Sequence, residues 1–162
     1  DGGKVGGAYG DTSGMCYDSK RNCLWFGHGG SPMMRYDFEG GKLTAVPTQA
    51  AVGVFMRETV YLPELDMLLN MFRVKTDAGQ VGNLAYDIEN RKWIGLDLPA
   101  SDGQPRFGTG VGYWCFGGGR SLHYDPGLKR AVFFFGNNEV LVLRPDKAGL
   151  KTFEVPLQAA KK

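Results

Sequence analysis

Short apolar runs alternate along this chain with polar turns that contain Gly, Pro, Asn or Asp. Three segments share one order of residues: a Tyr, a polar or Pro-containing turn, and a second apolar run. They span residues 17–27, 61–71 and 124–136. Val, Tyr, Phe, Trp and Thr crowd the runs, and these residue types favour the pleated surface of a sheet. Each segment predicts a β-hairpin, and the Asp after the Tyr at Asp18 and Asp125 starts a turn by hydrogen-bonding the backbone.

A second hairpin follows each of these segments, within residues 34–44, 84–94 and 140–153. Gly and Asn at hairpin tips supply the positive φ that such turns require. Each repeat is then strand, turn, strand, loop, strand, turn, strand, and a period of about 40–50 residues is typical of propellers and solenoids. We predict an all-β chain of three four-stranded antiparallel units, at about residues 12–46, 56–98 and 119–156.

The second strand of each repeat is apolar without alternation. These strands are Leu24-Trp25-Phe26, Met67-Leu68-Leu69 and Val132-Phe133-Phe134-Phe135. A strand that is polar on neither face is packed on both faces, as in a stack of propeller blades. A β-sandwich with two-sided core strands is the alternative architecture.

The repeat resembles kelch-type β-propeller blades, in the style of the central domain of galactose oxidase. Trp93 fits the late Trp of that motif, and Leu43 and Phe153 replace it in the other repeats. The double glycine of the motif is matched only at Gly29-Gly30, one residue late; the second repeat lacks it and the third has Gly136-Asn137-Asn138. The resemblance implies the propeller fold and says almost nothing about activity.

Three blades cannot close a ring, because propellers typically need four to eight. The first and last blades would expose apolar faces larger than a soluble monomer normally tolerates. We expect either a piece of a longer propeller, completed by another subunit, or two copies that pair about a two-fold axis into a six-bladed ring. The opening residues Asp1-Gly2-Gly3-Lys4, without a Met, favour a processed chain or a piece of a longer one.

Amino-acid composition and charge limit the kinds of partner that this chain is expected to have. Gly accounts for 25 of 162 residues, about twice the ordinary share, but the hydrophobic content of 43 % is enough for a core. The net charge of +2 carries no basic stripe, so nucleic acid is not expected as a partner. No apolar run approaches the ~18 residues of a membrane helix, so no membrane role is expected. The compartment stays open, with a secreted or periplasmic location favoured over the cytoplasm.

The three cysteines are Cys16, Cys23 and Cys115, and no Cys-x-x-Cys pair suggests structural zinc. Cys16 and Cys23 flank a turn. A tight hairpin would set them face to face as a cross-strand disulfide, and a one-residue slip would place them on opposite faces. Two buried free thiols are the alternative.

Charged residues precede two of the three signature tyrosines, Tyr61 and Tyr124, on the strands expected to line a propeller channel; the equivalent residues before Tyr17 are Ser13-Gly14. The candidates for ligand binding there are Arg57, Glu58, Arg120 and His123. Paired arginines suit a carboxylate or phosphate ligand, and a structural ion pair that lines a wet channel is the alternative. His28 and His123 are the only histidines, and the sequence shows no cluster of the three or four converging ligands that a metal site needs. No metal or cofactor is expected.

The irregular stretch Pro99–Gly119 carries aromatic and Arg residues of the kind that dominate interface energies. The interaction-loop candidates are Arg106, Phe107, Tyr113 and Trp114, with blade-to-blade packing as their alternative role. No catalytic residues stand out. The expected function is therefore a binding or scaffold module that makes protein or glycan contacts through its loops.

The competing interpretation is a carbohydrate-active or redox enzyme whose site is completed by another chain or by missing blades. Asp11, Glu58 and Asp102 are carboxylates that could pair for acid–base work on a glycoside, although their spacing does not single them out. No Gly-x-Ser-x-Gly turn supports a serine hydrolase.

Overall fold

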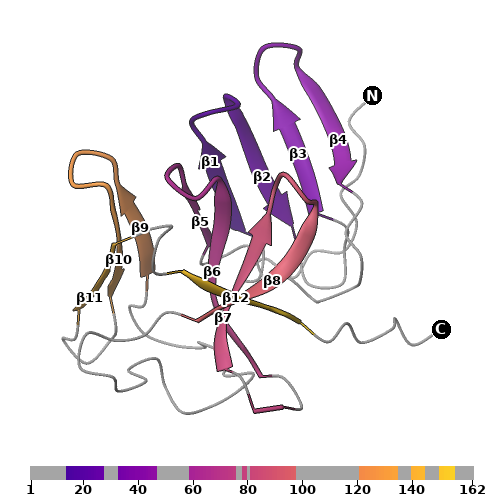
Figure 1. Cartoon of the computed structure of the whole chain (residues 1–162). Helices are drawn as coiled ribbons and strands as arrows, with labels where there is room; N and C mark the ends of the chain where they lie inside the picture. The colour runs from indigo at the N-terminus through magenta and orange to yellow at the C-terminus, as the bar shows by residue number, and fades with distance from the viewer. Residues whose placement is uncertain are drawn as a thin grey trace.

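The computed structural model describes residues 14–27, 33–46, 59–75, 78–79, 81–97, 121–134, 140–144 and 150–155, and within them the chain is all-β, without a helix (Figure 1). The prediction of an all-β antiparallel chain is confirmed. The twelve strands are β1 (Gly14–Asp18), β2 (Cys23–Gly27), β3 (Met33–Asp37), β4 (Lys42–Val46), β5 (Thr59–Leu62), β6 (Met67–Lys75), β7 (Val81–Asp87), β8 (Lys92–Asp97), β9 (Ser121–Asp125), β10 (Arg130–Phe134), β11 (Val140–Leu143) and β12 (Lys151–Glu154).

Five of the hairpins are built in the same way. Each has a four-residue loop between its last paired residues, and the fourth loop residue has a positive φ of 48° to 59°. These residues are Asn22, Gly41, Asp66, Arg91 and Lys129. A single left-handed residue at the end of such a loop turns the chain back into the antiparallel partner.

The Asp after the signature Tyr holds the loop as the sequence predicts. Asp18 Oδ1 accepts hydrogen bonds from the backbone N–H groups of Lys20 and Arg21, both at 3.0 Å. Asp125 Oδ1 accepts the equivalent pair from Gly127 and Leu128, at 2.8 and 2.9 Å. The carboxylate replaces the backbone partners that the turn residues lack.

The strands form three antiparallel sheets, ordered β1-β2-β3-β4, β12-β8-β7-β6-β5 and β11-β10-β9. The first sheet has the four strands expected of it. The strand expected to complete the third unit instead pairs with β8, so the second sheet has five strands and the third has three. The prediction of four strands in each of the three units is wrong in this respect.

The position of β12 has a packing cause. Phe153 lies opposite Gly95 in the register, and its ring covers Gly95 and Gly82 so closely that a Cβ at either position would collide with it. Two neighbouring glycines thus leave a trough on the second sheet that an aromatic side chain fills. No periodicity in the sequence indicates such a long-range match.

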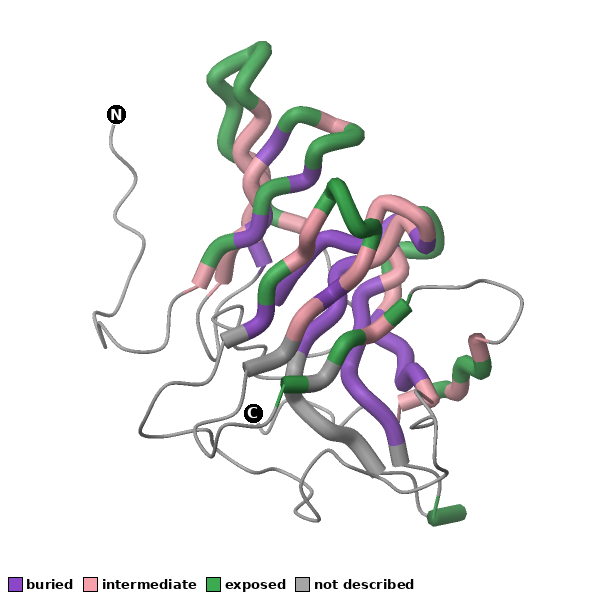
Figure 2. The backbone as a smooth tube through the Cα atoms, turned by 90° about the vertical axis from the view of Figure 1, so that its left-hand side faces the viewer, coloured by how far each residue is buried: buried purple, intermediate pink, exposed green. Residues whose placement is uncertain are grey.

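The second sheet is the middle layer of the structure. One core lies between it and the first sheet and includes Trp25, Leu68 and Tyr86; the other lies between it and the third sheet and includes Leu69 and Leu122. Leu68 and Leu69 point to opposite faces and are both 0 % exposed. Figure 2 shows this sheet as the most continuously buried part of the described backbone.

The expectation of two-sided packing is therefore confirmed for β6. In β2 it is wrong, because Trp25 is buried while its neighbours Leu24 and Phe26 are only half-buried. The first sheet packs against the second through one face only.

The first strands of the three sheets lie side by side, with β1 against β5 and β5 against β9. The last strands, β4 and β11, lie far from one another on opposite sides of this group (Figure 1). The hairpins β1–β2, β5–β6 and β9–β10 consequently come together at one end of the three adjacent strands.

Candidate functional site

A cleft of about 700 Å³ opens where these three first strands meet. The hairpin loops contribute Ser19, Pro63, Glu64, Pro126 and Lys129. The strands contribute Cys16, Tyr17, Thr59, Val60, Tyr61 and Tyr124. All three sheets take part, so the cleft exists only in the folded arrangement.

Two of the three loops begin with proline, at Pro63 and Pro126. Proline fixes its own φ near −65°, the value that the first turn position needs. The rim of the cleft is therefore conformationally restricted before any ligand arrives.

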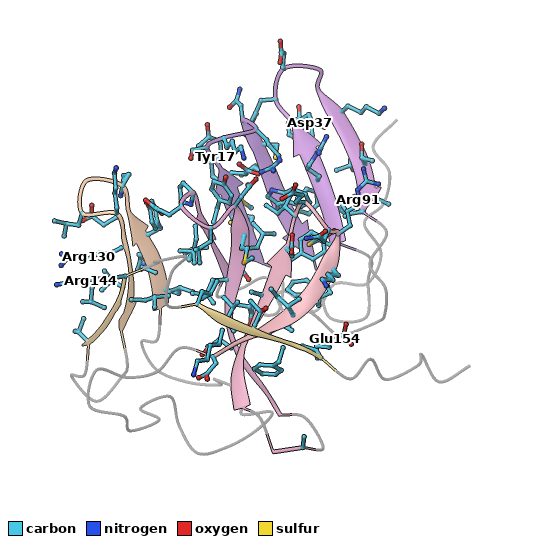
Figure 3. All side chains as sticks on the ribbon, in the orientation of Figure 1. Tyr17, Asp37, Arg91, Arg130, Arg144 and Glu154 are labelled. Carbon is cyan, nitrogen blue, oxygen red and sulfur yellow. The ribbon has the colours of Figure 1, made fainter. Side chains whose placement is uncertain are left out.

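The signature tyrosines meet in the cleft. Tyr17, Tyr61 and Tyr124 each occupy the penultimate position of a first strand, which is the position that aligned the repeats in the sequence. Tyr17 is 52 % exposed and lies at the end of β1 (Figure 3). Tyr61 is buried, and Tyr124 is half-buried.

Glu64 and Tyr124 join the β5–β6 hairpin to the third sheet. The Tyr124 hydroxyl donates to Glu64 Oε1 at 2.6 Å. Burial, with the Glu64 carboxylate beside it, raises the pKa of Tyr124 to about 12, so the phenol keeps its proton and remains the donor at neutral pH.

The second carboxylate oxygen of Glu64 is different. Oε2 is buried and has no hydrogen-bond partner within the described ranges. Leaving a buried acceptor unsatisfied costs about 1–3 kcal/mol. Among the described residues of the cleft, Glu64 Oε2 is therefore a buried acceptor with hydrogen-bonding capacity to spare.

An ionic bridge next to the cleft ties the first sheet to the second. The Asp66 carboxylate accepts from Lys20 Nζ at 2.6 Å, from both terminal nitrogens of Arg21 at 2.7 and 2.8 Å, and from the Tyr61 hydroxyl at 2.9 Å. The Arg21 guanidinium is the main reason that the pKa of Asp66 lies well below its usual range. Burial, followed by the bond to Asp66, raises the pKa of Tyr61.

Asp18 completes this bridge from inside the first sheet. Its side chain is fully buried, accepts from Arg21 at 2.9 Å and also accepts the indole N–H of Trp25 at 3.1 Å. A bidentate Arg held between two carboxylates is a rigid arrangement. The charged groups of this bridge pair with one another, so we regard the bridge as structural support for the cleft rather than as part of its lining.

Cys16 and Cys23 are free and buried. Cys16 pairs with Trp25 and Cys23 with Asp18, so the two thiols share a face without standing opposite one another. The alternative of two free thiols is confirmed. Burial, reinforced by Asp18, raises the pKa of Cys16 to about 12 and that of Cys23 to about 11, so neither is a thiolate nucleophile at neutral pH.

His123 is the one channel candidate that the structure describes. It pairs with Val132 in the third sheet and is exposed, while its neighbours Leu122 and Tyr124 face the second sheet. It is not among the residues that line the cleft. The remaining predicted residues lie outside the described ranges: Arg57, Glu58, Arg120, Arg106, Phe107, Tyr113, Trp114, Asp11 and Asp102.

The outer face of the first sheet is a second candidate surface. Two cross-strand rows cover it, Met15–Phe26–Met34–Ala45 and Tyr17–Leu24–Tyr36–Leu43, and neither contains a charge. Met15 is 68 % exposed and Leu43 is 44 % exposed. We call these eight residues the apolar face.

The far side of the third sheet is also partly apolar. Val140 and Val142 are about half exposed, at 51 % and 52 %, and Val132 is half-buried beside them. Arg130 and Arg144 lie on the same outer side, away from the second sheet (Figure 3).

Among the residues that the structure describes, no three His, Cys, Asp or Glu side chains are grouped as a metal site would require. The same residues include no helix long and apolar enough to cross a membrane. Comparison with family models, with curated proteins and with solved structures found no match for this chain.

Proposed function

We propose that this chain is a three-bladed portion of a kelch-type β-propeller, and that it acts as a binding and scaffold module that assembles with a second copy of itself. Three features support the proposal: the stacking of three sheets face to face, the adjacency of their first strands, and the matching hairpins at one end. Adjacent first strands are what blades around a common axis would have.

The apolar face carries the assembly proposal. This face joins eight uncharged side chains, of which Met15, Tyr17 and Leu43 are largely exposed, and a contiguous exposed apolar patch of this kind marks an interaction surface. A single blade of another propeller portion would cover it in the way that the second sheet covers the opposite face.

A second copy is the occupant that the described surfaces favour. Each copy offers the apolar face at one end of its stack and the valine-bearing face of the third sheet at the other. A two-fold axis would bring the first sheet of each copy against the third sheet of its partner and cover both faces at once. Six blades would then fall within the range of closed propellers.

The experiment is size-exclusion chromatography with light scattering. We expect a dimer of about 35 kDa, twice the 17.7 kDa chain. Met15→Lys together with Leu43→Lys should shift the mass to that of the monomer, because each adds a charge to the apolar face. Circular dichroism should show an unchanged strand content.

Leu128→Lys is the matched control. Leu128 is 61 % exposed in the β9–β10 hairpin, outside the apolar face, so this variant should remain dimeric. A wild-type chain that stays folded and monomeric at 100 µM would contradict pairing with a second copy. Equal dissociation by the Leu128→Lys control would remove the apolar face as its cause.

A further inference from the structure

We propose that the cleft between β1, β5 and β9 binds a neutral carbohydrate, with Glu64 and Lys129 as its polar contacts and Pro63 and Pro126 as its apolar rim. The proposal rests on the cleft alone and does not depend on assembly into a ring.

The polar groups of the cleft favour a ligand that both donates and accepts hydrogen bonds. Glu64 is an acceptor with one oxygen unused, Lys129 is a donor, and Ser19 offers a hydroxyl that does both. A sugar hydroxyl matches this mixture because it carries one donor and two acceptor positions.

The second Glu64 oxygen is the acceptor available to such a hydroxyl. Glu64 lines the cleft and Tyr124 holds its Oε1, so Oε2 is the carboxylate oxygen left for a ligand. A bound hydroxyl would then satisfy an acceptor that has no partner among the described residues.

The apolar lining suits the faces of a sugar ring. Val60 and the two hairpin prolines contribute apolar, conformationally restricted surface to the cleft. The C–H groups of a pyranose can pack on such a surface while its hydroxyls point to the rim. The cleft volume of about 700 Å³ lies within the ~300–1,000 Å³ of small-molecule sites.

Charge argues against ionic ligands. The cleft carries one carboxylate, Glu64, and one ammonium, Lys129, so its lining has no net charge and offers neither an anion nor a cation a net electrostatic attraction. The charges of Lys20, Arg21 and Asp66 are consumed in the neighbouring bridge. A neutral ligand is the class that neither group repels.

The test is saturation-transfer NMR followed by calorimetric titration with methyl glycosides of glucose, galactose, mannose and N-acetylglucosamine. Glucuronate and glucosamine serve as the anionic and cationic probes. We expect at least one neutral glycoside to bind, and to bind at least tenfold more tightly than both charged probes. Failure of every neutral glycoside, or tighter binding of a charged probe, would overturn the proposal.

Variants locate the binding. Glu64→Gln should weaken glycoside binding at least tenfold, and Glu89→Gln, on the exposed β7–β8 hairpin, should leave it unchanged. If Glu64→Gln does not fold, Lys129→Gln keeps the proposal testable and should weaken binding several-fold. Equal loss in Glu89→Gln, or no loss in the cleft variants, would place the ligand elsewhere.

The assembly variants separate this proposal from the propeller proposal. Met15→Lys with Leu43→Lys changes the oligomeric mass but leaves the cleft residues intact. Glycoside binding that persists in this monomer supports a site within one chain. Binding lost together with the dimer would contradict a site made by one chain.

Discussion

At the scale of single residues, the joint between the first two sheets depends on one carboxylate. Asp66 occupies a left-handed turn position with φ of 56° and receives hydrogen bonds from Lys20, Arg21 and Tyr61. Nothing in the spacing of these residues along the chain indicates that they meet. A positive φ at Asp66, which Asp and Asn tolerate better than most residues, aims its side chain across the sheet boundary.

Replacing Asp66 tests this joint. Asp66→Asn keeps the tolerance for positive φ but removes the charge, leaving the partly buried guanidinium of Arg21 with one carboxylate fewer. We expect the free energy of unfolding to fall by about 1–3 kcal/mol, measured by urea denaturation. Lys20→Met is the control and should cost less than about 1 kcal/mol, because Lys20 is mostly exposed. A neutral Asp66→Asn would show that the bridge adds no stability.

The same carboxylate predicts a pH dependence. The pKa of Asp66 is lower in the folded chain than its ordinary value of 3.8, so its ionised form stabilises the fold. That contribution is complete well above pH 3.8 and is lost as the pH falls through 3.8 toward the lower folded value. Between pH 7 and pH 2, the free energy of unfolding measured by urea denaturation should therefore fall more steeply for the wild type than for Asp66→Asn. Parallel curves would contradict the assignment.

At the scale of elements, the hairpins depend on local interactions, whereas the docking of β12 depends on residues far apart in the sequence. The five hairpins are local: a four-residue loop with one left-handed residue closes each, and the residues that close it are neighbours in the sequence. The docking of β12 is non-local. It depends on Phe153 finding the trough above Gly95 and Gly82, more than fifty residues earlier in the chain.

A substitution at Gly95 tests how Phe153 packs in this trough. Gly95→Ala places a methyl group where the Phe153 ring lies, so β12 must shift or leave the second sheet. We expect a loss of about 1–3 kcal/mol in the free energy of unfolding, and faster amide exchange in Thr152 and Glu154. Gly40→Ala is the matched control, because no atom lies within 4 Å of the added Cβ and the site is exposed. Equal stability of the two variants would contradict the packing explanation.

At the scale of the whole molecule, the described residues form a stack of three sheets, and within these residues only the middle sheet is covered on both sides (Figure 2). The two end faces retain exposed apolar side chains, such as Met15 on the first sheet and Val142 on the third. Hydrophobic burial within one chain therefore stops one layer short at each end. The prediction of a dimer rests on this arrangement, because the apolar face is formed by a whole sheet and not by a single residue or hairpin.

The sequence alone determined the β class and five of the six expected hairpins, because turn residues and the Tyr-Asp signature act over a few neighbouring positions. The tertiary structure alone decided which sheet receives β12, which residues form the Asp66 bridge, and that Tyr17, Tyr61 and Tyr124 share a cleft with Glu64. The tyrosines were visible as a repeat, but their meeting depends on how the sheets stack. Sheet stacking is set by side-chain volume and charge between residues distant in the chain, and a local pattern carries no record of it.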